Sequence, residues 1–396
     1  MANNALSIEQ AYTFLSALYG QAIGTTGSLV SVDSKNFVSV AQAVLATGYD
    51  NTMSAISQVL GRTIFAIRPY TARFRGIDAD AQRWGNMTRK INYCDNALDS
   101  TDDSITLTDG SSVDPWSIKK PTVLQTNWYG QQAFQDHVTI FETQLDTAFQ
   151  GPEEFARFIS GVMQNMMDKL EMFREEEARA ALINFAAGKA AANNQYINVL
   201  QAYYDETGTA LTAATMLADS AYVPFVKWLY SYINTLTRMM AERSTIFHIN
   251  VTGKPVPRHT PADRMKAYMS ARIMDAIESI ALPSVYGADR LKMVDWEGVA
   301  YWQSINAPMS IKTKPVYLAT DGTLTNASGD TTINTVVGIL YDEDAILMNR
   351  FMQRMDRTPI NPRGLYSNVF YHEHIRVMND FTENGVVLYA ADPTTT

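Results

Sequence analysis

Residues 152–187 read PEEFARFISGVMQNMMDKLEMFREEEARAALINFAA, and this stretch carries the strongest helical pattern in the chain. Pro152 suits the first position of a helix, and Glu153 and Glu154 complement the positive end of the helix dipole. Gly188 follows directly and is the residue type most often found just past a helix end. The stretch therefore predicts one helix about 54 Å long.

Apolar residues recur along this helix at spacings of three and four, which is the period of one helix face. They are Phe155, Phe158, Ile159, Val162, Met163, Met166, Met167, Leu170 and Phe173. Charged residues interrupt the stretch too often for a membrane span, and no heptad is held long enough for a coiled coil. We therefore expect a long amphipathic helix packed on a sheet or on other helices.

In the second half of the chain, segments with the spacing of helices are interrupted and followed by segments with the alternation of strands. Helices are predicted from Pro224 to Met240 and from Thr260 to Leu282, with a strand at 246–251 between them. Beyond residue 290 the period becomes two, and strands are predicted at 316–318, 336–340, 369–371 and 385–389, with turns at 321–322 and 328–330. The order predicts an α+β fold.

The first 61 residues contain only four charged side chains, Glu9, Asp33, Lys35 and Asp50. The segment has short helical patterns but is too weakly apolar to form its own core. We expect it to lie along another surface. The alternative, an ordinary N-terminal helical subdomain, stays open.

Two blocks of opposite charge follow. Residues 62–93 hold seven basic and two acidic side chains, including Arg73, Arg75 and Asp78, whereas residues 95–114 hold six aspartates and no base. Alternation before Asp109-Gly110 predicts a hairpin with its tip there. The two blocks could pair between neighbouring subunits; a solvated surface hairpin is the alternative.

Composition narrows the class of protein. The 396 residues are 46% hydrophobic, which supports a sizeable core, but only 18% charged, below the roughly 25% usual for soluble proteins. A surface this poor in charge suggests contact with something other than water. The net charge of −9 disfavours general nucleic-acid binding. A single cysteine, Cys94, excludes an internal disulfide, and we expect a protein made inside the cell, without targeting signal or membrane span.

Catalytic motifs are scarce. No phosphate loop, dinucleotide fingerprint, zinc-protease helix or nucleophile elbow is found. His372-Glu373-His374 is the only cluster that suggests a metal, since alternate residues of a strand share a face, but a third ligand would have to come from elsewhere. Cys94 would need a base such as His137 to act as a nucleophile. We expect no catalytic, cofactor or metal site, and a structural, self-associating protein.

In this order of segments the chain resembles the major capsid proteins of tailed bacteriophages, which have the Hong Kong 97-type fold. The helix 152–187 is similar to their spine helix, and Val337–Ala345 is similar to the stretch leading out of their axial domain. The resemblance implies an N-terminal arm at 1–65, an E-loop region at 66–140, a peripheral domain at 141–215, an axial domain at 216–365 and return strands of the peripheral domain at 366–396.

The family's function is implied in the same way. The chain would assemble into pentamers and hexamers of an icosahedral head that encloses double-stranded DNA without sequence-specific binding. Its partners would be itself, a scaffolding protein, a portal protein and a decoration protein, with no membrane. It would be assembled in the host bacterial cytoplasm and reside in the virion.

Three alternatives stay open. An encapsulin-type nanocompartment shell shares the fold. A metal-dependent hydrolase would use His372, Glu373 and His374. A phage tail or adhesion protein would use the turn-rich region 316–340 to bind a receptor.

Overall fold

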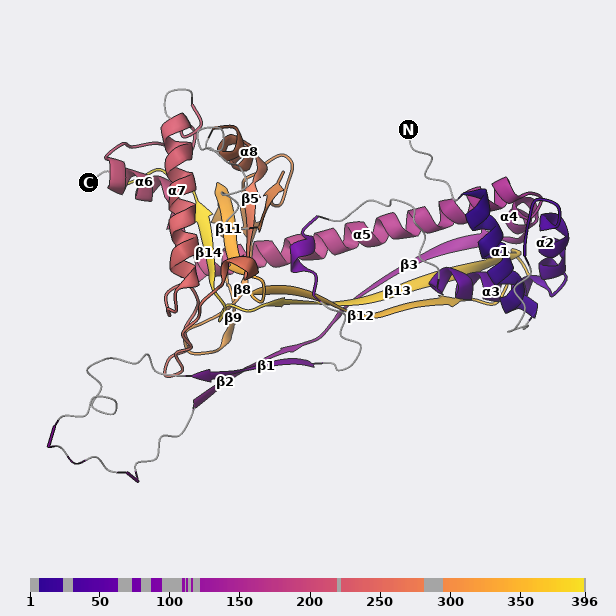
Figure 1. Ribbon diagram of the computed structural model, residues 1–396, viewed down its shortest axis with the longest axis horizontal. Coiled ribbons are helices and arrows are strands. Elements are labelled where there is room, and N and C mark those ends of the chain that lie inside the picture. Colours follow the sequence, from indigo (N-terminus) through magenta and orange to yellow (C-terminus); the bar gives the residue numbers. More distant parts are fainter. Residues whose placement is uncertain are drawn as a thin grey trace.

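The structure is a computed structural model that describes residues 7–23, 31–62, 73–79, 87–94, 109–110, 112, 115–116, 122–218, 222–280 and 295–394. It is an elongated molecule with a lobe at each end of one long helix, α5 (Figure 1). This helix spans Pro152–Ala191, so it begins where the sequence predicts. Its 40 residues make a rod about 60 Å long. The predicted mixture of helices and strands is confirmed.

The predicted end of α5 is wrong, because the helix continues past Gly188 to Ala191. A Cβ built on Gly188 would lie 2.6 Å from Cζ of Phe381. The glycine therefore makes room for an aromatic ring that packs against the helix, and it does not end the helix.

Three helices from the start of the chain pack at the N-terminal end of α5. They are α1 (Ile8–Ile23), α2 (Phe37–Leu45) and α3 (Tyr49–Arg62). Their buried side chains share one core with Leu145 of α4 (Glu142–Ala148) and with Phe155 and Ile159 of α5. The low-charge segment thus forms a helical subdomain, the alternative that the sequence left open. Its core is completed by α5, which agrees with the expectation that the segment cannot form a core alone.

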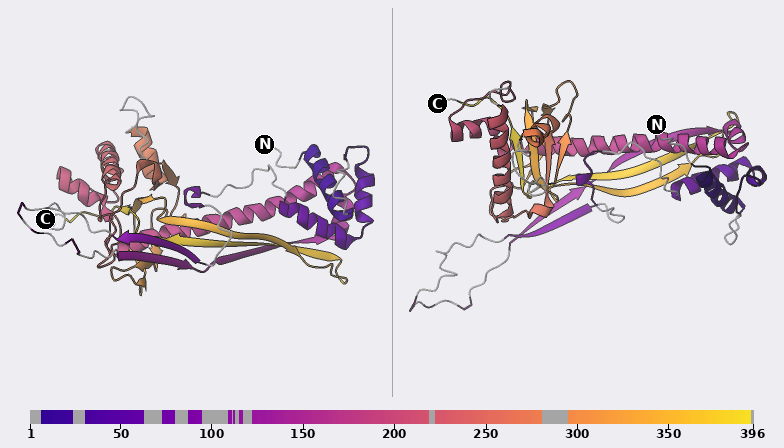
Figure 2. Two further views of the ribbon diagram at one scale, coloured as in Figure 1. Left: turned by 60° about the horizontal axis from the view of Figure 1, so that its bottom comes forward. Right: turned by 45° about the horizontal axis from the view of Figure 1, so that its top comes forward.

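A three-stranded antiparallel sheet runs beside α5 through the middle of the molecule (Figure 2). Its order is β12 (Ile346–Arg357), β13 (Tyr366–Asn379) and β3 (Gln132–Phe141). Most positions of β13 alternate between buried and half-buried, as expected for a strand with one face against α5. The sheet and α5 together connect the two lobes.

The second lobe contains a five-stranded sheet covered by helices. Its strand order is β4 (Tyr196–Asn198), β14 (Gly385–Tyr389), β11 (Val336–Asp342), β5 (Met265–Ser270) and β6 (Asp295–Val299). The helices are α6 (Val199–Thr207), α7 (Tyr222–Ala241) and α8 (Ala271–Ile280). Every residue of β11 is buried, so this strand is the centre of the lobe's core.

Helix α7 confirms the prediction over 224–240, but the predicted helix over 260–282 is wrong in its first half. A short 3-10 helix (η2, Ala262–Arg264) leads into strand β5, and α8 begins only at Ala271. Met265 and Met269 fit a helical spacing, yet they are buried in a strand that pairs with β11 on one side and β6 on the other. A strand buried on both faces has no alternation that would distinguish it from a helix.

The predicted strand at 246–251 is also wrong. The segment is a loop whose Ile249 amide donates to the Phe381 carbonyl at 2.9 Å, and Val251 forms only an isolated bridge to Lys254. The predicted turn at Asp321-Gly322 is present between β8 (Val316–Leu318) and β9 (Leu324–Asn326). Two further short strands, β7 (Ile311–Thr313) and β10 (Thr331–Ile333), pair beside it.

A two-stranded hairpin projects from the body (Figures 1 and 2). Strands β1 (Met87–Cys94) and β2 (Thr122–Tyr129) pair antiparallel, with Met87 opposite Tyr129, so the hairpin is centred on position 108, midway between 87 and 129. That centre lies next to the predicted tip at Asp109-Gly110, where Gly110 has a φ of +81°. The alternating residues 105–108 lie outside the described residues.

Within the described ranges, no helix is both long and apolar enough to cross a membrane.

Candidate functional site

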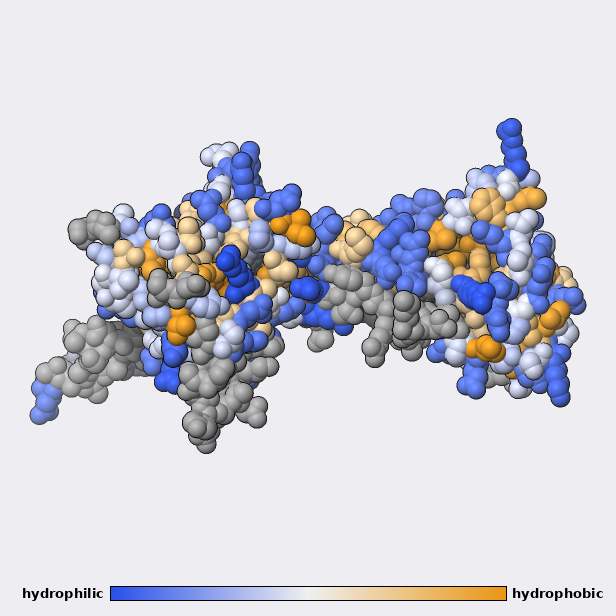
Figure 3. Space-filling view, turned by 90° about the horizontal axis from the view of Figure 1, so that it is seen from above, coloured by the Kyte–Doolittle hydropathy of each residue, from blue (hydrophilic) through white to orange (hydrophobic). Residues whose placement is uncertain are grey.

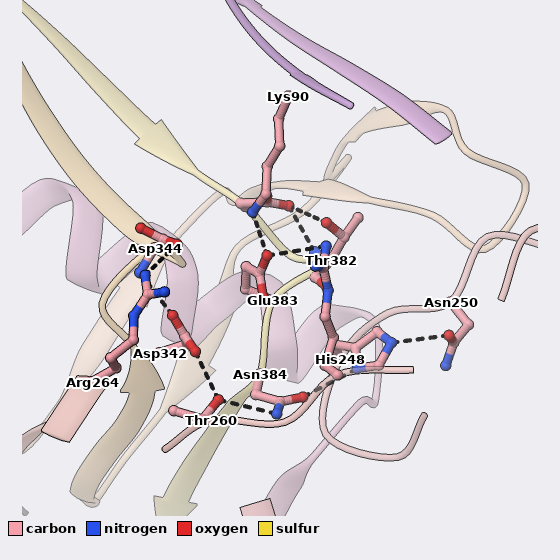
Figure 4. Close-up of polar contacts among 12 residues, drawn as sticks. Lys90, His248, Asn250, Thr260, Arg264, Asp342, Asp344, Thr382, Glu383 and Asn384 are labelled. Atoms are coloured by element: carbon pink, nitrogen blue, oxygen red, sulfur yellow. Dashed lines mark hydrogen bonds and ion pairs between the residues drawn. The ribbon is translucent and has the colours of Figure 1, made fainter. Parts of the chain in front are cut away.

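Lys90 of β1 attaches the projecting hairpin to the body (Figure 4). Its ammonium lies 2.7 Å from Oδ2 of Asp380 and also binds Glu383. Both carboxylates are nearly buried and belong to the turn between β13 and β14, residues 380–384. Arg258 lies 3.0 Å from the same Glu383 oxygen, so two cations share two acids. We call Lys90, Arg258, Asp380 and Glu383 the hairpin anchor.

The electrostatics of the hairpin anchor follow from its burial. Burial raises the pKa of Glu383, and Lys90 and Arg258 offset part of that rise. Burial also lowers the pKa of Lys90, but Asp380 and Glu383 outweigh this effect and the net shift is upward. The ammonium therefore stays charged because the carboxylates are present, and each group depends on the others.

Further contacts hold the base of the hairpin. Arg376 of β13 donates to the Gly130 carbonyl and to Thr88 Oγ1, both at 2.8 Å, and its guanidinium stacks 4.2 Å from the Phe351 ring. Leu124 of β2 packs with Val251 and Val256. One face of the hairpin is thus fixed by charge, hydrogen bonds and apolar packing.

A chain of hydrogen bonds links the same turn to the loop before β5 (Figure 4). Thr260 donates to Asp342 at 2.8 Å and accepts from the Asn384 amide at 3.1 Å. The Asn384 carbonyl oxygen lies 3.2 Å from His248 Nδ1, and His248 Nε2 lies 3.0 Å from Asn250 Oδ1. Burial lowers the pKa of His248 to about 4, although both amides favour its protonated ring.

Lys189, near the end of α5, is completely buried beside this chain. Its ammonium donates to Asn194 Oδ1 at 3.0 Å and to the Phe247 carbonyl at 3.2 Å. Burial lowers its pKa to about 7, and Asp380 offsets only part of the shift. The end of the long helix, the turn 380–384 and the hairpin therefore meet at one buried polar junction.

A second polar junction lies at the middle of α5, where residues 73–78 pass over it. This segment includes the short 3-10 helix η1 (Arg75–Ile77). A pocket of about 100 Å³ is lined there by Arg73, Arg75, Asp78, Glu171, Arg174, Met348 and Arg350. We call it the arginine pocket. Arg174 forms its floor, because it is buried and pairs with Glu171 and with Glu373 at 2.7 Å each.

The structure separates the three residues of the metal hypothesis. His372 and His374 lie half-buried on one face of β13, whereas Glu373 lies on the opposite face and is completely buried. The Glu373 carboxylate binds Arg174 and so cannot join the two imidazoles. Within the ranges that the structure describes, no three His, Cys, Asp or Glu side chains are grouped to hold a metal ion.

Cys94 and His137 are placed in different sheets. Cys94 ends β1 and packs near Leu124 and Leu318, and His137 lies on β3 with its ring 5.3 Å from Phe370. The arrangement gives no support for a thiol nucleophile with this base.

Several residues that meet in these two junctions were not recognised from the sequence. Asp380, Glu383 and Arg174 were not singled out, although two acids between the apolar ends of β13 and β14 are a signal for buried carboxylates. Arg73 and Arg75 were noted for their charge, and the structure places both at the arginine pocket.

The chain matches one family profile and is similar in fold to chains of solved phage structures. The sequence profile described as Phi29-like phage major capsid protein matches residues 20–389. A chain in the capsid structure of Staphylococcus phage Andhra is similar at a TM-score of 0.53 and 10% identity, covering 83% of this chain and 87% of that one. A chain in the structure of the head fiber and inner core protein gp22 of native bacteriophage P68 is similar at 0.51 and 9%, covering 83% and 86%. None of the curated proteins is a significant match.

Proposed function

Because the chain belongs to the Phi29-like phage major capsid protein family, we propose that copies of it assemble into the pentamers and hexamers of an icosahedral phage head. The head would enclose double-stranded DNA, and the protein would reside in the virion. The family match over nearly the whole chain is the observation that carries this proposal. The role is structural and not enzymatic.

The architecture supports a Hong Kong 97-type fold. We assign α5 as the spine helix and the β1–β2 hairpin as the base of the E-loop. Residues 1–65 would take the place of the N-terminal arm, although their helices α1, α2 and α3 fold as a helical subdomain on α5. The three-stranded sheet with α5 would be the core of the peripheral domain, and the five-stranded sheet the core of the axial domain.

Strand pairing crosses the boundary that we expected at residue 365. Strand β12, within 216–365, pairs with β13, and β14, within 366–396, lies beside β11 in the five-stranded sheet. We therefore propose that the chain leaves the axial domain with β12 and returns to it with β14. The other two ranges are also divided, because β3, nearly all within 66–140, pairs with β13 in the three-stranded sheet, and β4, within 141–215, pairs with β14 in the five-stranded sheet. We therefore propose that β3 belongs to the peripheral domain and β4 to the axial domain.

The exposed face of the hairpin supports self-assembly. Ile91, Tyr93 and Tyr129 are 52%, 74% and 71% exposed, and their spacing and pairing put them on one face of β1–β2. Hydrophobic side chains also reach the surface of the N-terminal lobe (Figure 3), including Ile8 and Val38. Exposed apolar surface of this kind suits burial against neighbouring copies.

Other partners follow from the proposed role. A scaffolding protein, a portal protein and a decoration protein are the partners that a phage head would need. The net charge of −9 argues that DNA is enclosed without tight or sequence-specific binding.

The rival functions are less well supported. The family match favours a phage head over an encapsulin-type shell or a tail protein. The burial of Glu373 against Arg174 removes one side chain from the hydrolase hypothesis.

Negative-stain electron microscopy of the gel-filtered full chain, alone and with phage lysate proteins, tests the proposal. We expect closed particles or rings of five and six subunits. Tubes or trimers would support a tail protein instead. A monodisperse monomer or dimer under every condition would contradict the capsid role.

A further inference from the structure

The arginine pocket gathers positive charge from three separate parts of the chain. Its four arginines are Arg73 and Arg75 from the segment that passes over α5, Arg174 from α5 itself and Arg350 from β12. Like charges brought this close repel one another unless anionic groups balance them.

Acids of the chain balance only part of this charge. Glu171 and Glu373 each bind Arg174 at 2.7 Å. Asp78 lies 3.8 Å from Arg350. Against four arginines the described residues thus supply three carboxylates, and one positive charge is left over.

The same arginines have donors that no strong hydrogen bond uses. The Arg75 guanidinium is 63% exposed, and it lies 3.6 Å from the Glu171 carboxylate, beyond the range of a good hydrogen bond. The buried Nε of Arg350 has no hydrogen-bond partner within the part of the chain that the structure describes. A buried charged donor without a partner costs free energy, and a bound anion would remove that cost.

The backbone that carries the two exposed arginines is fixed in place. Phe74, between Arg73 and Arg75, is buried, and its ring packs edge-on 5.2 Å from the Tyr268 ring. On the other side of η1, the Ala79 amide donates to a carbonyl of β12 at 3.0 Å. Both ends of the segment are therefore held by the body, which lowers the entropy cost of binding an ion there.

The size and lining of the pocket select its ligand. A volume of about 100 Å³ has room for several water molecules, and so for one small anion but not for an extended polyanion. Arginine forks bind the oxygens of phosphates and carboxylates. A carboxylate presents both oxygens in one plane, whereas a tetrahedral oxyanion accepts hydrogen bonds from several directions, which suits donors from three elements. Asp78 and Glu171 also line the pocket and would repel the closely spaced phosphates of DNA.

We propose that the arginine pocket binds one free tetrahedral oxyanion of the inorganic phosphate or sulfate class. The ion would join segment 73–78 to α5 and β12 through charge-assisted hydrogen bonds. Because it would bind the folded chain and not the unfolded one, it would also stabilise the fold as its concentration rises above the dissociation constant. The site belongs to a single folded chain and does not depend on assembly.

Equilibrium dialysis of the unassembled full-length protein against radiolabelled orthophosphate tests the proposal. Sodium chloride holds the ionic strength constant, so that general screening does not change during the titration. We expect saturable binding of one ion per chain. Unlabelled sulfate should displace the label, and acetate should do so at least about tenfold less effectively. Absence of saturable binding, or equal displacement by acetate and sulfate, would overturn the proposal.

Substitutions locate the bound ion. Arg73→Gln with Arg75→Gln should weaken orthophosphate binding by about tenfold or more. Arg75→Lys keeps the charge but loses the fork, so it should weaken binding by a smaller factor. Arg157→Gln is the matched control, because Arg157 lies on α5, is 67% exposed and has one acid partner at 3.3 Å.

The two arginines are exposed, so all variants should unfold at the wild-type temperature in chloride alone. Wild-type affinity in the double variant, or an equal loss of affinity in the Arg157→Gln control, would refute the assignment to this pocket.

A short DNA duplex separates the two sources of phosphate groups. We expect the duplex to leave labelled orthophosphate in place, since the pocket admits one small ion and its acids repel neighbouring phosphates. Displacement by the duplex would mean that the pocket holds a phosphate of the DNA backbone, and it would overturn the assignment to a free ion.

Discussion

Lys90 joins two parts of the chain that are 290 positions apart, since its ammonium binds Asp380. Folding removes three charged side chains from water here: Lys90, Asp380 and Glu383. Removal of the cation leaves two nearly buried carboxylates: Glu383 keeps Arg258 as its partner, and Asp380 keeps the hydrogen bonds from the amide and hydroxyl of Thr382. The cost of such an unpaired buried charge exceeds the value of the pair itself.

We predict that Lys90→Ala lowers the free energy of unfolding by about 2 kcal/mol, less than for a fully buried pair because Arg258 remains. Lys169→Ala is the control: Lys169 binds Asp136 at a similar 2.9 Å but is 49% exposed, against 25% for Lys90. The control should cost less than about 1 kcal/mol. Urea unfolding of the unassembled chains, followed by circular dichroism, measures both. Equal costs would show that burial of the hairpin anchor is unimportant.

His248 makes stability depend on pH in a predictable direction. Burial lowers its pKa to about 4, while Lys189 and Arg258 also oppose its charge and Asn384 and Asn250 favour it. Between that value and the usual pKa of about 6.5, the unfolded chain binds more protons than the folded chain. Stability contributed by neutral His248 is therefore present above pH 6.5 and is lost as the pH falls toward 4.

His248→Gln should remove up to about 1.4 kcal/mol per pH unit from the slope of stability against pH in that window. Unfolding free energies of wild type and variant, measured from pH 4 to 8, give the two slopes. The variant's stability at pH 8 is the reference, because neither chain has a charged side chain at position 248 there. Parallel curves over the whole range would contradict the burial of a neutral imidazole.

At the scale of elements, the sequence predicts those helices and strands whose pattern is local. Helix α5 and α7 have amphipathic spacing and clear beginnings. The failures have a common physical cause. Strand β5 pairs with β11 and β6 along its two edges, and five of its six residues are buried, so its apolar residues carry no period that excludes a helix.

The candidate site was less predictable than the fold. Charge patterns placed Arg73 and Arg75 among residues of interest, but their pocket also needs Glu171 from α5 and Arg350 from β12. Contacts between residues so far apart in the chain leave no local pattern. The same applies to Lys90 and Glu383.

Two glycines of α5 give opposite predictions for the same substitution. Gly188→Ala would put a Cβ 2.6 Å from the Phe381 ring, so we expect a loss of about 1 to 3 kcal/mol. Gly161→Ala meets no atom within 4 Å and should gain about 0.5 to 1 kcal/mol from the helix preference of alanine. Thermal unfolding of the two variants tests this. A stabilised Gly188→Ala would mean that Phe381 does not pack against the helix.

The continuity of α5 is the property on which both lobes depend. Met166 is buried near Leu170 and Tyr371, in the stretch between the lobes. Met166→Pro should cost about 3 kcal/mol or more and abolish assembly, because proline removes a helical hydrogen bond and clashes with the preceding turn. Met166→Leu, which keeps the volume, should cost less than about 1.5 kcal/mol. Closed particles at wild-type yield from the proline variant would show that an intact α5 is not required.

The whole molecule is two cores connected by a helix and a sheet, with a hairpin that has one attached face and one free face. Side chains at even positions of β1 and β2, such as Lys90 and Leu124, face the body, and those at odd positions, such as Tyr93, face away. Stability should therefore depend on the even positions and assembly on the odd ones.

Tyr93→Ser and Leu124→Ser test this division. Tyr93 is 74% exposed, so its replacement should change the unfolding free energy by less than about 0.5 kcal/mol while lowering the yield of particles. Leu124 is buried against Val251 and Val256, so its replacement should cost about 2 kcal/mol in the unassembled chain. Urea unfolding and particle counts by electron microscopy are measured on the same preparations. If Tyr93→Ser assembles like wild type, the free face of the hairpin is a solvated surface and the contacts between copies lie elsewhere.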